Sequence, residues 1–105
     1  MMSREHRINQ LITENLQPSV LKTVNESNRH HVPEGSETHF KLIIVSDKFK
    51  NTTKINRHRL INKLLATELN TGLHALSLYL YTGEEWHKLK NNLPESPACR
   101  GGYEE

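Results

Sequence analysis

Seven histidines are the side chains of this sequence best suited to binding a transition metal. They are His6, His30, His31, His39, His58, His74 and His87, and the chain has one cysteine, Cys99. A neutral imidazole binds iron or zinc readily. A single thiol forms no internal disulfide, which fits a reducing cytosol, and it cannot hold a metal cluster alone. A metal site here therefore needs histidines or ligands from a partner.

His74 is the histidine whose position most favours coordination. It stands at the start of a predicted strand, in register with a run of alternating leucines. A histidine in such a place is most often held by one hydrogen bond, but an imidazole on a rigid strand end can also bind iron or zinc. His30 and His31 lie in a long polar segment, where simple exposure to solvent is the plainer interpretation.

Positive charge is concentrated in the middle of the chain. Between residues 41 and 63 the single acid is Asp47, and the bases are Lys41, Lys48, Lys50, Lys54, Arg57, Arg59 and Lys63. A local field of this kind attracts phosphates or an acidic protein surface. Arg57 and Arg59 fall at the predicted start of a helix, where positive charge opposes the helix dipole. A bound phosphate would relieve that cost, and a solvated basic turn is the alternative interpretation.

Three helices and three strands are predicted to carry these residues. The first helix begins after Ser3 and is stopped by Pro18, and strands are expected over 20–24, 39–46 and 73–81. The central helix is expected to be capped by Asn56 and to end before Gly72. Thr82 and Glu85 form a capping box that opens the last helix. Residues 25–38 read as a long loop.

The order α-β-β-α-β-α sets the topology. The first two strands are joined by a loop and should be antiparallel, whereas the second and third are joined through a helix and should be parallel. We therefore predict an α+β protein with a three-stranded mixed sheet and helices on one face. A single domain is expected over residues 1–93, followed by a flexible C-terminal tail at 94–105.

Composition favours a binding protein over an enzyme or a membrane protein. Only 34% of the residues are hydrophobic and the mean hydropathy is −0.71, which predicts a thin core. The sequence has no run of about 18 apolar residues and no apolar leader, so we expect a cytoplasmic protein that does not enter membranes. Walker, Rossmann and metalloprotease patterns are absent as well. We expect no enzymatic activity and no small-molecule substrate.

Three segments, taken together and in order, resemble the BolA family. They are NRHRL at 56–60, GSETHF at 35–40 and HAL at 74–76, and the likeness extends from the first helix to Trp86. The tail at 96–101 also resembles that of enterobacterial members. One departure is Asn51, where the family usually has glycine. Asparagine tolerates the left-handed conformation, so the turn should be retained.

The resemblance implies a fold similar to class II KH domains, although no G-x-x-G loop for clamping RNA is present. It further implies a partnership with a monothiol CGFS glutaredoxin and a shared, bridging [2Fe–2S] cluster. The C-terminal histidine ligand of the family falls on His74. The second ligand comes from the loop between the first two strands and falls on His30, with His31 and His39 as the other choices.

The resemblance also implies a role in transcriptional regulation of morphology and stress genes. From their charge, the natural phosphate contacts on double-stranded DNA would be Lys48, Lys50, Lys54, Arg57, Arg59 and Lys63. On the sequence alone, the shared cluster is the leading hypothesis and DNA binding is the alternative. The two roles can coexist in one protein.

Overall fold

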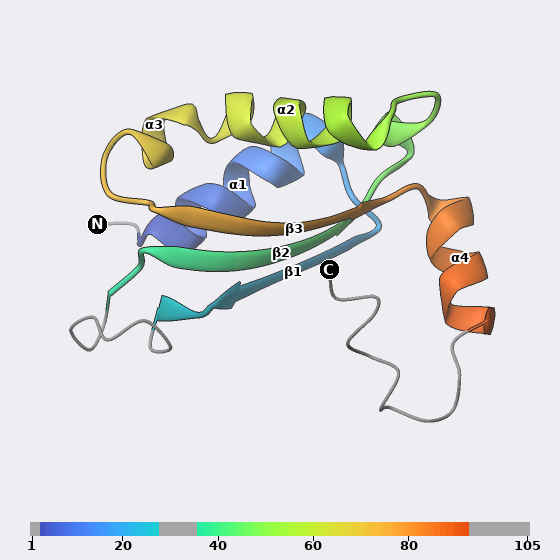
Figure 1. Cartoon of the computed structure of the whole chain (residues 1–105), viewed down its shortest axis with the longest axis horizontal. Helices are drawn as coiled ribbons and strands as arrows, with labels where there is room; N and C mark the ends of the chain where they lie inside the picture. Colours follow the sequence, from blue (N-terminus) through green and yellow to red (C-terminus); the bar gives the residue numbers. More distant parts are fainter. Residues whose placement is uncertain (1–2, 28–35, 93–105) are drawn as a thin grey trace.

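A computed structural model of the chain describes residues 3–27 and 36–92 (Figure 1). Its helices are α1 (Arg4–Leu16), α2 (Lys54–Leu64), α3 (Ala66–Leu69) and α4 (Gly83–Asn92). Its strands are β1 (Val20–Asn25), β2 (His39–Val45) and β3 (Ala75–Tyr81), and a short 3₁₀ turn, η2 (Asp47–Phe49), follows β2. The predicted tail and most of the predicted loop at 25–38 lie outside the described residues.

The sheet confirms the predicted topology. Its strand order is β1-β2-β3, with β1 antiparallel to β2 and β2 parallel to β3. Val45 in β2 is opposite Val20 in β1 and Tyr81 in β3. Because side chains alternate along each strand, this register decides which residues share a face.

One face of the sheet is covered by helices. Figure 1 shows α1, α2 and α3 on one side of the strands and α4 at the end where β3 leaves the sheet. Phe40, Leu42 and Ile44 alternate along β2 toward the covered face and are fully buried there. The rest of the core comes from both layers: Ile8, Ile12, Leu16, Phe49, Ile61, Leu65, Leu73 and Leu80. Burial of these side chains is the main force that holds the helices on the sheet.

The central helix begins earlier than its sequence suggests. Thr53, and not Asn56, is the N-cap of α2, and the Asn56 N–H donates to Thr53 Oγ1 at 3.2 Å. Asparagine and threonine are both good N-caps, so composition alone did not separate them. The helix also breaks at Leu65 before α3, where a single helix was expected. The earlier start puts Arg57 further into α2 than the first position that a cap at Asn56 would give it.

Other local predictions are confirmed. The Ser3 hydroxyl accepts the His6 N–H at the start of α1. Asn51 has φ of 61°, which is the left-handed conformation expected at this turn. Among the described residues, the structure has no helix long and apolar enough to cross a membrane.

Candidate functional site

His39 and His74 lie side by side at one end of the sheet. His74 directly precedes β3, and its N–H donates to the Thr38 carbonyl at 2.8 Å, which fixes it beside the start of β2. The two ring centroids are 5.9 Å apart, with the rings nearly perpendicular. His74 is exposed, whereas His39 is half-buried and its Nδ1 lies 2.8 Å from Thr38 Oγ1. Two imidazoles therefore reach the same end of the sheet, which we call the histidine end.

The described residues on either side of positions 28–35 meet at this same end. The Ser27 hydroxyl is buried and accepts the N–H groups of Thr38 and His39, at 2.9 and 3.2 Å. The Asn25 side chain donates to the Ser36 carbonyl at 2.9 Å, which ties the two sides of the segment together. His30 and His31 themselves lie outside the described residues.

The donor set at the histidine end is incomplete for a metal. Within residues 3–27 and 36–92, no group of three His, Cys, Asp or Glu side chains could hold a metal ion. His39 and His74 are nevertheless two imidazole nitrogen donors at the starts of adjacent strands, and imidazole is a ligand that suits iron. Such a pair fits a [2Fe–2S] cluster whose remaining ligands are thiolates from a second protein.

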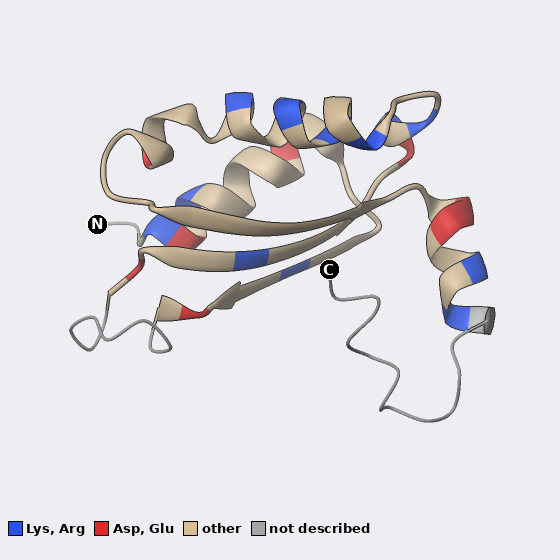
Figure 2. Cartoon of the chain, in the orientation of Figure 1, with Lys and Arg blue, Asp and Glu red and all other residues tan. Residues whose placement is uncertain are grey.

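The predicted phosphate contacts fall into two groups. Lys48, Lys50, Lys54, Arg59 and Lys63 are exposed on η2, the turn after it and α2, and we call these five residues the basic surface. Figure 2 shows that α2 carries basic residues and no acidic ones, with acid near it in η2. This arrangement favours contact with phosphates.

Arg57 is the exception, because its guanidinium is buried. The residue is only 4% exposed and donates to the carbonyl oxygens of Thr52 and Leu80, at 2.9 and 3.2 Å. It also makes a two-pronged ion pair with Glu85, with N···O distances of 2.6 and 3.0 Å. The geometry does not support Arg57 as a phosphate contact, and it gives this residue a structural role.

Glu85 completes the predicted capping box as well. It accepts the Thr82 N–H at 2.9 Å, and the Glu85 N–H donates to the Thr82 hydroxyl. The hydrogen bond from Arg57 lowers the pKa of Glu85 from 4.5 to about 2, with a smaller contribution from the Thr82 N–H. Arg57 and Glu85 thus attach α4 to α2, and the capping box was the one sequence signal that pointed to this carboxylate.

A buried acid that sequence reasoning missed lies in α3, a few residues before His74. Glu68 is 4% exposed and accepts hydrogen bonds from Arg4 and Arg7 of α1, the shortest at 2.6 Å from each. The hydrogen bond from Arg7 is the main reason that the pKa of Glu68 is lowered. Gly72 has φ of 129°, and a Cβ there would lie 2.8 Å from Arg4 Nη2. Because these partners are about sixty residues apart in sequence, no local pattern predicts the cluster.

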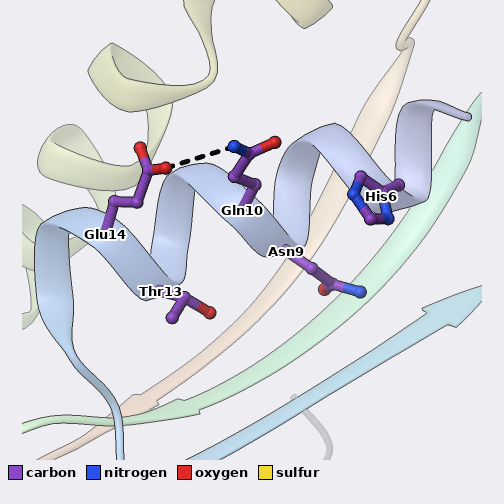
Figure 3. Close-up of a pocket in the computed structure, with 5 residues that line it drawn as sticks. All are labelled: His6, Asn9, Gln10, Thr13 and Glu14. Carbon is purple, nitrogen blue, oxygen red and sulfur yellow. Dashed lines mark hydrogen bonds between the residues drawn. The ribbon is translucent and has the colours of Figure 1, made fainter. Parts of the chain in front are cut away.

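An open hollow runs along the outer side of α1 (Figure 3). It has a volume of about 350 Å³ and is lined by His6, Asn9, Gln10, Thr13 and Glu14. Gln10 donates to Glu14 within it at 3.2 Å. It includes neither the histidine end nor the basic surface, so it has no part in the site.

Comparison with known proteins gives consistent matches over nearly the whole chain. A family model described as "BolA-like protein" matches residues 12–85. The "DNA-binding transcriptional regulator BolA" of Escherichia coli is 50% identical over 101 residues, covering 96% of this chain and 95% of that protein. The protein of the same name from Vibrio cholerae is 45% identical and covers 90% of each chain.

Eukaryotic relatives and solved structures extend this similarity. "BolA-like protein 1" of Homo sapiens is 42% identical, covering 93% of this chain and 71% of that one. The structure of BolA1 from Arabidopsis thaliana has a TM-score of 0.76 and 38% identity, covering 81% of this chain and 98% of that chain. BolA1 from Mus musculus has a TM-score of 0.76 and 37% identity, covering 94% and 80%. The observed fold is therefore that of these proteins.

Proposed function

This chain belongs to the BolA family, and on that premise we propose that it is a DNA-binding transcriptional regulator that contacts duplex DNA through its basic surface. Three bacterial relatives at 45–50% identity bear that description in their names. The observation that carries the proposal is a helix with five exposed cations on it or beside it and no acid of its own. The protein would work in the cytoplasm by binding, without turning over a substrate.

The chemistry of the basic surface suits the DNA backbone. Each cation that neutralises a phosphate releases a condensed counterion, so affinity should fall steeply as salt rises. Arg59 and Lys63 are one helical turn apart on α2, and Lys54 occupies its first turn next to free backbone N–H groups. Asn62 is exposed between Arg59 and Lys63 and could accept or donate at a base edge.

The first prediction concerns two cations of the basic surface. The double substitution Lys54→Gln with Arg59→Gln should weaken binding to a 30-base-pair duplex by about tenfold or more at moderate salt. The slope of log affinity against log salt should shrink by roughly two, since two phosphate contacts are lost. Fluorescence anisotropy of a labelled duplex at several salt concentrations measures both quantities.

The matched control is Lys88→Gln with Lys90→Gln on α4, which removes the same charge away from the basic surface. This control variant should bind the duplex with an affinity within about twofold of that of the wild-type protein. Equal losses in the two double variants would mean that only net charge matters, and the basic surface would then have no special role.

We propose as a second role that the protein partners a monothiol CGFS glutaredoxin and shares a [2Fe–2S] cluster with it. The specific observation in favour is the pair of imidazoles at the histidine end, 5.9 Å apart. When bound through imidazoles, such a cluster has a higher reduction potential than one held by thiolates alone. His74, which is exposed, would be the first ligand. His30, His31 or His39 would be the second, and the partner would supply the thiolates.

The second prediction concerns His74. Anaerobic titration of a glutaredoxin holo-dimer with wild-type protein should give a new visible circular dichroism spectrum, and His74→Ala should abolish it. Because the His74 side chain is exposed, the free energy of unfolding should change by less than about 0.5 kcal/mol. His58→Ala, an exposed histidine on α2, is the control and should retain the spectrum. An unchanged spectrum with wild-type protein would remove this role, and DNA binding would stand alone.

A further inference from the structure

The described aromatic residues divide into two sets. Both phenylalanines, Phe40 and Phe49, are fully buried in the core. Tyr79, Tyr81 and Trp86 are only half-buried and gather elsewhere. The rings of Tyr81 and Trp86 are 5.5 Å apart. Tyr79 is two residues before Tyr81 in β3 and therefore shares its face of the sheet, so the three half-buried aromatic side chains line one region outside the core.

The tyrosines lie on the face of the sheet that α1, α2 and α3 leave uncovered. They alternate in β3 with leucines that pack against the core, so they point to the opposite side. In register, Tyr79 in β3 is opposite Ile43 in β2, which is opposite Lys22 in β1. In the same way, Ser77 is opposite Lys41, which is opposite Val24. We call these six residues the open face. Val24 is 42% exposed, and α4 borders the face where Trp86 meets Tyr81.

The charge of the open face is positive. Lys22 and Lys41 come from adjacent strands, where Figure 2 shows basic residues on β1 and on β2. On α4, the Lys90 ammonium is 5.9 Å from the centre of the Trp86 ring. The acid nearest in sequence to β1 on its C-terminal side is Glu26, whose N–H donates to the His39 carbonyl at the histidine end, away from Tyr79. Glu84 of α4 is paired with Lys88 at 3.6 Å.

We propose that the open face, together with Tyr81 and Trp86, binds a short single-stranded nucleic acid. Unpaired bases stack on aromatic rings whatever their sequence, because every base has a π-face. Lys22 and Lys41 neutralise the phosphates of the same strand. Measured across its three strands, the sheet is about 10 Å wide, and this width suits a few nucleotides and not a duplex. A duplex also hides the faces of its bases, and an acidic peptide would use the lysines but not the rings.

This site is distinct from the basic surface. The residues of the basic surface belong to η2, the following turn and α2, and α2 packs on the opposite side of the sheet. The two sites can therefore be inactivated separately. Single-strand binding at the open face neither requires nor excludes duplex binding at α2.

Trp86 provides a direct measurement, because it is the only tryptophan of the chain. Titration of the full chain with a twelve-nucleotide oligothymidylate or oligouridylate should quench its fluorescence saturably. Comparing the two oligomers distinguishes DNA from RNA as the ligand. Both Tyr79→Leu and the double substitution Lys22→Gln with Lys41→Gln should weaken binding by about tenfold, as expected for one lost stack or two lost phosphate contacts.

The control is Lys54→Gln with Arg59→Gln, which should leave single-strand affinity within about twofold while weakening duplex binding. Thermal melts by circular dichroism verify that each variant is folded. If Tyr79→Leu does not fold, the double lysine variant alone tests the proposal. Absence of quenching with either oligomer would overturn the proposal. So would equal affinity for an oligoglutamate peptide, or a loss caused by the control and not by the open-face variants.

Discussion

Replacement of Arg57 with alanine is expected to lower the free energy of unfolding by about 3 kcal/mol. The guanidinium is buried, and it donates to two carbonyl oxygens and to both oxygens of Glu85. It also lies 5.6 Å from the centre of the Phe49 ring, in the core. Removal leaves the Leu80 carbonyl without this donor. Because the Glu85 side chain is 42% exposed and can be rehydrated, we take the low end of the usual range for broken buried pairs.

Urea unfolding followed by circular dichroism measures this change. Arg59→Ala is the matched control, since Arg59 is two residues away on the same helix but exposed, and it should cost less than about 0.5 kcal/mol. For a domain of this size, the melting temperature of Arg57→Ala should fall by roughly 10 °C or more. If both variants were equally stable, the buried ion pair would contribute little and α4 would be held by other contacts.

This prediction changes how charge-reversal experiments must be interpreted. On the sequence alone, Arg57 and Arg59 are equivalent members of one basic turn. In the structure only Arg59 faces solvent, so loss of DNA binding in Arg57→Glu would report unfolding. Arg59→Glu would report the interface. Tests of the basic surface should therefore exclude Arg57.

The sheet and its order were predictable because they depend on local patterns. Alternating apolar residues in 39–45 and 75–81 define two strands, and the helix between them makes the pair parallel. The Thr82–Glu85 capping box was also readable, since its two partners are three residues apart. The position of His74 at a strand start followed from the same alternation.

The features that the sequence did not predict depend on distant partners. Glu85 looks like a capping residue, and nothing local indicates that Arg57 reaches it across twenty-eight positions. Likewise, the contact of His39 with His74 requires the register of β2 on β3, which only the folded sheet supplies. Threonine and asparagine both suit the start of α2, so the residue types alone did not decide between Thr53 and Asn56.

Glu68→Gln is expected to lower the free energy of unfolding by about 2 kcal/mol at neutral pH. Glu68 is buried and joins α3 to Arg4 and Arg7 of α1. The amide keeps the volume but loses the charge, which leaves the Arg4 guanidinium, 14% exposed, without its counterion. We place the cost below that of a fully buried pair because the Arg7 side chain is 38% exposed. The control is Glu14→Gln on the exposed side of α1, measured by the same urea unfolding.

The same substitution has a distinct signature in acid. A carboxyl whose pKa is lowered by folding stabilises the protein above its unfolded pKa, and the stabilisation is lost as pH falls through the folded pKa. The pKa of Glu68 is lowered by Arg7 and Arg4, and that of Glu85 is lowered from 4.5 to about 2 by Arg57. Wild-type stability should therefore decline as pH drops from about 4.5 toward 2.

In Glu68→Gln that decline should be shallower, because one of the two carboxyls no longer titrates, and the two proteins should converge in stability at the acid end. A constant difference between them at every pH would contradict an electrostatic origin and indicate a packing defect. The distinction bears on function, because residues 68 and 73 are joined by a backbone hydrogen bond just before His74. The ion pair holds the turn that leads to His74. If the protein shares a cluster as proposed, Glu68→Gln should therefore weaken that sharing less than His74→Ala but more than Glu14→Gln.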